Sequence, residues 1–145
     1  MKKLLLMVLL SATVALGQQG GNAAPKSNAK VLTREEFDSL LAKPDQLLII
    51  DVRRPDEVSS IGGFPVYLSI QINDLEKSLA WIPKDRSIVT VSNQAHRGAA
   101  AADILTKHGY KVAGAIGVET YEKAGGEAAK KIVPPPPAKT NASNN

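Results

Sequence analysis

The sequence predicts an α/β fold in which helices cover both faces of a central parallel sheet. Residues 47–52 form an apolar run bounded by polar residues, as a strand buried on both faces does, and residues 87–91 are rich in the branched side chains that favour strands. Segments with helical periodicity separate the strand-like runs between residues 30 and 130. Strands that alternate with helices in this way form parallel sheets, because each helix returns the chain to the same end of the sheet.

The first helix and the first strand have clear local signals. Thr33 and Glu36 have the spacing of a capping box, which predicts a helix beginning after Thr33. That helix carries three apolar side chains on one face: Phe37, Leu40 and Leu41. The run of residues 47–52 follows as a strand, and residues 65–72 are expected to form a second strand.

The second half of the region continues the alternation. Asn73 and Asp74 are typical first residues of a short helix that runs towards Leu79. Gly109 stands where a glycine ends a helix in the left-handed conformation. The remaining elements follow in order: a strand over 87–91, a helix over 97–108, a strand over 112–116 and a helix over 118–124.

The two ends of the chain differ from this region in composition. Residues 1–17 begin with a charged start, continue with a short apolar run and end in small residues, which predicts a secretory signal cleaved after Gly17. The apolar stretch is shorter than the roughly 20 residues of a spanning helix, so we expect a periplasmic or secreted protein without a stable membrane anchor. Residues 18–29 are predicted to be a flexible leader, 30–130 the domain and 131–145 a disordered proline-rich tail.

Composition excludes several classes of function. The chain has no cysteine, so it has no thiol for a persulfide, a thiolate metal site or a cysteine nucleophile. Removal of the predicted signal leaves 16 basic residues against 14 acidic ones, a net charge of +2. No segment combines clustered basic residues with aromatic ones, so nucleic-acid binding is not expected. We expect neither a metal nor a cofactor.

The loop after the strand of residues 87–91 is the candidate binding site. In parallel sheets, ligands bind beyond the carboxyl ends of the strands. This loop leads into the helix over 97–108, whose first backbone N–H groups have no partner within the helix. We therefore expect an anion-binding loop made of six residues: Ser92, Asn93, Gln94, Ala95, His96 and Arg97.

The same loop resembles that of the rhodanese family. The family has a cysteine at the end of this strand and an arginine five residues later, and the loop amides hold an anion. In this sequence Ser92 stands at the cysteine position and Arg97 at the arginine position. The resemblance implies the rhodanese fold, but a serine oxygen cannot carry a persulfide. Rhodanese sulfurtransferase activity is therefore not expected.

Three further segments carry the resemblance over about a hundred residues. The first, Asp51-Val52-Arg53 with Pro55 and Glu57, is similar to the family's Asp-Val-Arg segment. The second, Gly62-Gly63-Phe64-Pro65, is similar to its Gly-His-Ile-Pro turn. The third, residues 116–121, is similar to its closing Gly-Gly-x-x-x-Trp. The second has Gly63 in place of histidine, and the third has Ile116 and Tyr121 in place of glycine and tryptophan.

Two residues of the loop have alternative interpretations. Ser92 is either a small residue whose hydroxyl caps the loop, or a nucleophile that would need His96 as its base and Asp51 to orient it. Arg97 either meets an anion, or pairs with an acid such as Asp51 or Glu57, and these two roles are compatible.

The other notable polar and aromatic residues have plainer interpretations. His96 is expected to be a solvated loop residue, while His108 suits a helix carboxyl end. Asp51 and Trp81 are expected to be structural.

Three functional hypotheses follow. The first is a non-catalytic rhodanese-like module of the cell envelope that binds a small oxyanion or a protein partner through the loop of residues 92–97. The second is a hydrolase or phosphatase-like enzyme that depends on Ser92. The third is a structural accessory domain whose tails position it against other envelope proteins.

Overall fold

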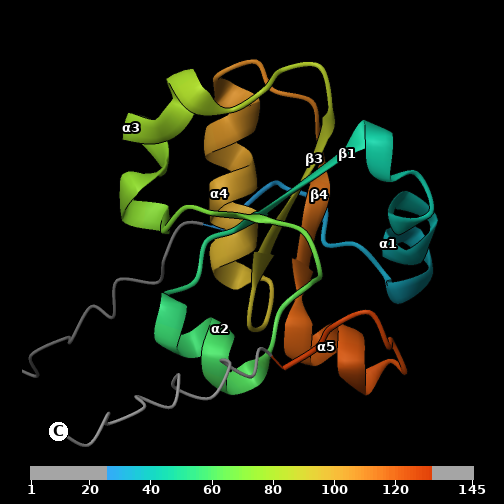
Figure 1. Cartoon of the computed structure of the whole chain (residues 1–145). Coiled ribbons are helices and arrows are strands. Elements are labelled where there is room, and N and C mark those ends of the chain that lie inside the picture. Colours follow the sequence, from blue (N-terminus) through green and yellow to red (C-terminus); the bar gives the residue numbers. More distant parts are fainter. Residues whose placement is uncertain (1–25, 132–145) are drawn as a thin grey trace, which may run out of the picture.

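A computed structural model describes residues 26–131 of the chain, and they form an α/β domain. Its sheet has four strands in the order β2-β1-β3-β4. Every neighbouring pair is parallel, which confirms the predicted sheet (Figure 1). The strands are β1 (Leu47–Asp51), β2 (Leu68–Ser69), β3 (Ser87–Ser92) and β4 (Val112–Gly117).

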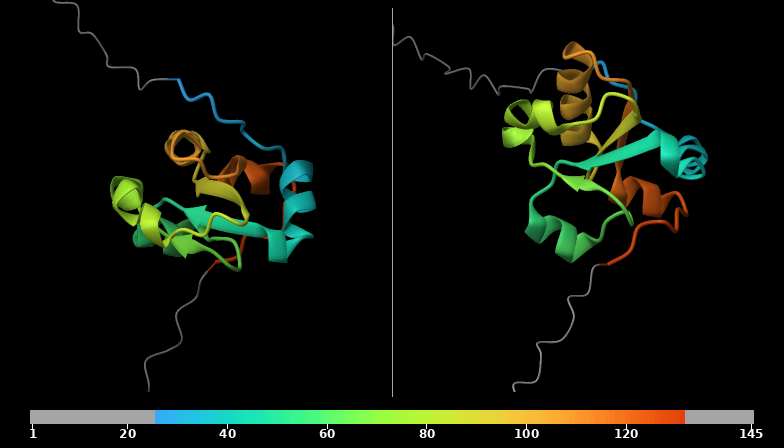
Figure 2. Two further views of the ribbon diagram at one scale, coloured as in Figure 1. Left: turned by 90° about the horizontal axis from the view of Figure 1, so that it is seen from above. Right: turned by 45° about the horizontal axis from the view of Figure 1, so that its top comes forward.

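Helices lie on both sides of this sheet, as predicted. The α-helices are α1 (Arg34–Leu41), α2 (Pro55–Ile61), α3 (Leu75–Ser78), α4 (His96–Lys107) and α5 (Val118–Lys123). Single turns of 3₁₀-helix are η1 (Pro44–Gln46), η2 (Ile72–Asp74) and η3 (Leu79–Trp81). α3 and α4 lie on one side of the sheet, and α1 and α5 lie on the other (Figures 1 and 2).

Alternate residues of the strands supply two separate cores. Ile49 and Val89 face α1 and α5, where the rings of Phe37, Phe64 and Tyr121 pack with centroids 4.6 to 5.5 Å apart. Ile50 and Ile88 face the other way, towards Leu75 of α3 and the inner side of α4. A sheet buried on both faces requires largely apolar strands, which explains the composition of residues 47–52 and 87–91. The two polar residues buried within them, Asp51 and Thr90, are hydrogen-bonded.

The predicted helix ends are confirmed at two places. The Thr33 hydroxyl accepts a hydrogen bond from the Glu36 amide, and the Glu36 carboxylate accepts one from the Thr33 amide, as a capping box requires. Gly109 follows α4 with a φ of +79°, the left-handed conformation that favours glycine.

Two expectations are wrong. The strand predicted over 65–72 is reduced to the two residues of β2, at the edge of the sheet. Pro65 has no N–H to donate to a neighbouring strand, and Val66 is 80% exposed. The apolar residues of this segment therefore favour a strand by their type but lack the burial that stabilises one. Trp81 is not a packed structural residue either, because it is 84% exposed at the end of η3.

The predicted signal peptide and the proline-rich segment from residue 132 onward lie outside the described residues, as does most of the leader. Within residues 26–131, no helix is both long enough and apolar enough to cross a bilayer.

Candidate functional site

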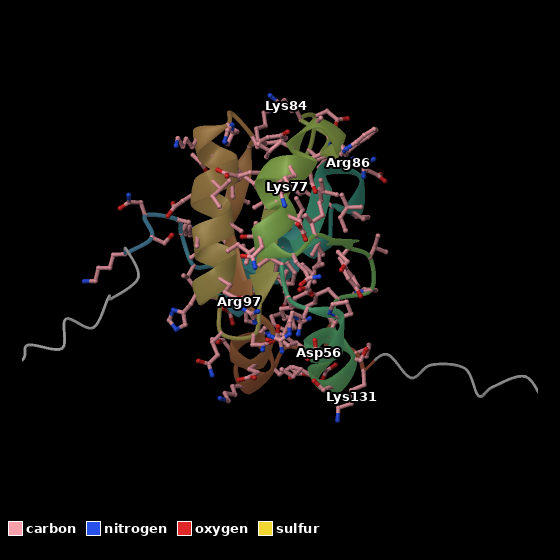
Figure 3. All side chains as sticks on the ribbon, turned by 90° about the vertical axis from the view of Figure 1, so that its left-hand side faces the viewer. Asp56, Lys77, Lys84, Arg86, Arg97 and Lys131 are labelled. Carbon is pink, nitrogen blue, oxygen red and sulfur yellow. The ribbon has the colours of Figure 1, made fainter. Side chains whose placement is uncertain are left out.

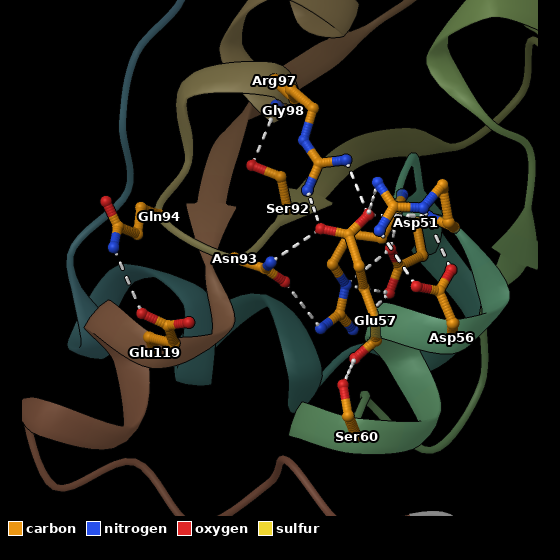
Figure 4. A network of polar contacts seen from close by, with 12 residues as sticks. Asp51, Asp56, Glu57, Ser60, Ser92, Asn93, Gln94, Arg97, Gly98 and Glu119 are labelled. Atoms are coloured by element: carbon orange, nitrogen blue, oxygen red, sulfur yellow. Dashed lines mark hydrogen bonds and ion pairs between the residues drawn. The ribbon is translucent and has the colours of Figure 1, made fainter.

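The carboxyl ends of β1 and β3 and the amino ends of α2 and α4 meet at one end of the domain (Figures 1 and 4). β3 ends at Ser92 and α4 begins at His96, so the six predicted site residues run from the last residue of β3 to the first two residues of α4. Ala95 has a φ of 70°, which lets the chain turn sharply into α4. Gly117 permits a close approach, because a Cβ there would lie 2.7 Å from the Ala95 nitrogen.

Ser92 is buried and has a structural role. It is 1% exposed, and its hydroxyl accepts a hydrogen bond from the Gly98 amide at 3.1 Å (Figure 4). This is the capping role that the sequence suggested as one of two. Within residues 26–131, the exposed His96 makes no hydrogen bond to Ser92.

A buried ion pair lies beneath the loop. Arg53 Nη2 donates to Asp51 Oδ2 at 2.7 Å, and Arg53 Nε donates to Asp51 Oδ1 at 2.9 Å, with both side chains fully buried. Arg53 also donates to the Gly62 carbonyl oxygen at 2.7 Å and to Asn93 Oδ1 at 3.2 Å. Asp51 is therefore structural, as expected, and Arg53 connects β1, α2 and the loop.

Arg97 is paired with Glu57 of α2. Its two terminal nitrogens donate to the two carboxylate oxygens at 2.8 and 2.5 Å, and Asn93 Nδ2 donates to Glu57 Oε1 at 2.9 Å (Figure 4). The hydrogen bonds from Arg97, and to a smaller extent the one from the Arg54 backbone N–H, lower the pKa of Glu57 from 4.5 to about 2. Of the two acids that the sequence offered as partners, Glu57 is the one that binds Arg97.

The backbone of the loop has unused hydrogen-bond donors. The N–H groups of residues 93–97 donate no hydrogen bond to any acceptor in the described part of the chain. Four of these five residues, Asn93, Gln94, His96 and Arg97, line a pocket of about 250 Å³ together with Ser92 and Glu119. Successive N–H groups at the start of a helix favour anions.

Glu119 is the lining residue that sequence reasoning missed. Its carboxylate accepts a hydrogen bond from Gln94 Nε2 at 3.3 Å and lines the same pocket as Arg97. Its position after β4 was the available signal, because the carboxyl ends of parallel strands lie together.

Few unpaired charges surround the loop. Arg54 is paired with Asp56 at 2.9 Å, and Lys84 and Arg86 lie at the opposite end of the domain from Arg97 (Figure 3). No three His, Asp or Glu side chains among residues 26–131 are arranged to hold a metal ion.

Comparison with solved structures shows the same fold. The reduced CoADR-RHD protein of Bacillus anthracis aligns with a TM-score of 0.61 and 26% identity, over 70% of this chain and 18% of that one. A rhodanese-like domain protein of Staphylococcus aureus aligns with a TM-score of 0.58 and 21% identity, over 72% of this chain and 99% of that one. A Rhodopseudomonas palustris protein of unknown function, described as a possible tyrosine phosphatase, has a TM-score of 0.59 and 24% identity, over 69% of this chain and 84% of that one.

A search of curated proteins finds no significant match. The family model for the rhodanese-like domain matches residues 33–117, which is more than half of the chain. The matched region runs from the cap of α1 to the last residue of β4 and includes the whole loop. The chain therefore belongs to the rhodanese-like domain family, with Ser92 and no cysteine at the end of β3.

Proposed function

We propose that this protein is a non-catalytic rhodanese-like module of the cell envelope that binds a small oxyanion at the loop of residues 92–97. The observation that carries the proposal is the run of five backbone N–H groups, at residues 93–97, without an acceptor in the described part of the chain. Each is a donor that an anion's oxygen atoms can satisfy. The envelope location rests on the predicted signal of residues 1–17.

Ser92, the last residue of β3, supports a binding role without catalysis. The Ser92 hydroxyl already accepts the Gly98 N–H, and a neutral hydroxyl is a poor nucleophile without an adjacent base. Sulfur transfer needs a thiolate that can accept sulfane sulfur, and the chain contains no cysteine.

The charges around the loop favour weak binding. Arg97 is already neutralised by Glu57, and the Glu119 carboxylate lines the same pocket. Attraction therefore comes mainly from the backbone dipoles, which contribute about 0.3 to 1 kcal/mol at an exposed helix terminus. A millimolar dissociation constant corresponds to about 4 kcal/mol, so hydrogen bonds from the loop N–H groups must supply the rest of the binding free energy. We expect dissociation constants of millimolar or weaker, with a marked dependence on salt.

The alternative, a Ser92-dependent hydrolase or phosphatase-like enzyme, has less support. The description of the Rhodopseudomonas palustris protein as a possible tyrosine phosphatase applies to that protein, and an identity of 24% carries only the fold to this one. Here Ser92 is 1% exposed, and Asp51 is held by Arg53 instead of orienting His96.

Titration with sulfate and with phosphate, followed by backbone amide resonances, tests the proposal. The resonances of residues 92–98 should move at millimolar anion, while those of the opposite end, such as Lys84 and Arg86, stay fixed. Chloride at matched ionic strength is the control. If the loop resonances do not move at tens of millimolar sulfate and phosphate, the oxyanion proposal fails, and binding of a protein partner at this loop should replace it.

A further inference from the structure

We propose that Glu57 is an internal competitor for the loop, whose carboxylate occupies Arg97 and thereby sets how tightly the loop binds anions. This inference rests on the proposed function and names the residue that limits it. Among the described residues that line the pocket, Arg97 is the only arginine or lysine. When Glu57 is bound to Arg97, an external anion meets a neutral ion pair. When Glu57 is not bound, the anion meets the positive charge of a free guanidinium.

The contacts of Glu57 are those of a bound anion. Its two carboxylate oxygens accept hydrogen bonds from both terminal nitrogens of Arg97, and one of them also accepts a hydrogen bond from Asn93 Nδ2, so its side-chain hydrogen-bond donors come from the loop. A bidentate arginine and carboxylate pair is among the stronger and more geometrically specific hydrogen-bond arrangements in proteins. With 14% of its side chain exposed, Glu57 is also largely shielded from water that would weaken the pair.

The neighbouring ion pairs indicate that Glu57 alone holds Arg97. Arg53 is bound by Asp51, and Arg54 is bound by Asp56 at 2.9 Å while its Nη1 also lies 3.5 Å from Glu57 Oε2. No other carboxylate in the described part of the chain contacts Arg97. Removing the charge of Glu57 would consequently leave Arg97 without an ionic partner beside the unused N–H groups of the loop.

The amide variant removes this charge with little structural change. Glu57 also accepts the Arg54 backbone N–H at 3.1 Å, which caps α2. A glutamine side chain retains one carbonyl oxygen for a hydrogen bond and has nearly the same volume as glutamate. Glu57→Gln therefore separates the loss of the negative charge from the loss of the helix.

Asp56→Asn is a matched control for that variant. Asp56 lies beside Glu57 on α2, but its carboxylate is 69% exposed and pairs with Arg54. The control removes one negative charge from the same helix and leaves the Arg97 pair in place. A general change in the net charge of this end of the domain would affect both variants equally.

The experiment is a sulfate titration of the full chain and both variants at constant ionic strength, followed by the amides of residues 92–98 and the Arg97 side-chain N–H resonance. One charge-assisted hydrogen bond gained by the anion should tighten binding to Glu57→Gln on the order of tenfold. Binding to Asp56→Asn should stay within about twofold of wild type, because exposed charges are screened.

The outcomes separate this inference from the proposed function. If wild type binds sulfate and Glu57→Gln binds it equally well, the inference is wrong and the proposed function stands. Equal gains in both variants would also overturn it, since they would reflect net charge alone. A response from Glu57→Gln only would support the inference and reject anion binding by the wild-type loop. If none of the three proteins responds, both ideas fail.

A second variant keeps the test decisive if Glu57→Gln does not fold. Glu57→Ala vacates the volume of the carboxylate, which a free acetate ion can fill. Acetate should then raise the melting temperature of Glu57→Ala by more than it raises that of wild type or of Asp56→Ala. Equal effects of acetate on all three proteins would contradict the inference.

Discussion

The carboxylate of Asp51 and the guanidinium of Arg53, two residues apart in sequence, form a fully buried ion pair beneath the candidate loop. Arg53 also reaches the Gly62 carbonyl and the Asn93 side chain. Both charges lie outside water, so each depends on the other for its stability. The Asp51 and Arg53 pair therefore holds the loop in place through Asn93, and because the pair is neutral overall it adds no net charge to the site.

We predict that Asp51→Asn destabilises the domain by about 3 to 5 kcal/mol, because it leaves the buried Arg53 charge without its partner. Urea denaturation followed by circular dichroism measures the loss. Asp56→Asn removes an acid from an exposed pair with Arg54 and should change stability little. Equal losses in the two variants would contradict the assignment of the Asp51 pair as structural.

Acid should weaken the contact between α2 and the loop. The Glu57 pKa is lowered from 4.5 to about 2, chiefly by its hydrogen bonds with Arg97. Because the folded pKa is the lower one, the stabilisation is complete above pH 4.5 and is lost as the pH falls towards 2.

We therefore expect Glu57→Gln to be less stable than wild type at pH 7, by about 1 to 3 kcal/mol, and to approach it near pH 2. Urea denaturation of both proteins at several pH values measures the difference. A gap in the unfolding free energy that stayed constant from pH 7 to pH 2 would show that Glu57 is not charged and paired in solution.

The purified protein should not transfer sulfur from thiosulfate to cyanide, because it has no cysteine to hold the sulfur. Sulfur transfer by the wild-type protein at a rate above that of the enzyme-free reaction, and abolished by Ser92→Ala, would contradict this prediction. Ser92→Cys tests the environment of the position, where the Gly98 N–H would face the new sulfur. Its thiol pKa should fall below the value of about 8.5 for a free cysteine.

Gly117→Ala should displace the loop. The new Cβ would lie 2.7 Å from the Ala95 nitrogen and 2.8 Å from two Gln94 atoms, all of them backbone. Overpacking of this kind costs about 1 to 3 kcal/mol. We expect lower thermal stability, and amide resonances of residues 92–97 that move more than those elsewhere in the domain. Unchanged loop resonances would mean that the loop does not approach Gly117 this closely in solution.

Export should remove the first 17 residues, because Ala15 and Gly17 provide the small side chains that a signal peptidase accepts. The measurement is mass spectrometry of the protein from the soluble envelope or secreted fraction. A mature chain that begins at Gln18 is expected. An intact Met1 in that fraction would reject the predicted cleavage.

Local and periodic signals predicted most of the fold. The run of residues 47–52 and the cap at Thr33 are short-range patterns with a direct physical cause, and both occur where they were expected. The segment 65–72 failed because its apolar residues were assigned to a strand without information on burial. Whether Val66 is covered depends on elements far away in sequence.

The candidate site was predicted in position but not in its contacts. The order of strand, loop and helix located residues 92–97, because ligands bind beyond strand ends in parallel sheets. The choice of Glu57 as the partner of Arg97 depends on how α2 packs, 40 residues earlier in the chain. Arg53 was recognised only as part of a family motif, since arginine is seldom fully buried and no local pattern predicts that it is.

Because Trp81 is exposed, its fluorescence emission can report contacts that the protein makes with other molecules. It is the single tryptophan of the chain, and its indole is in contact with water in the folded state as it would be in the unfolded one. Its emission should hardly change on denaturation, so unfolding is better followed through the buried ring of Tyr121. For the same reason, a blue shift of that emission on mixing with another molecule would signal association at η3 with little background from folding.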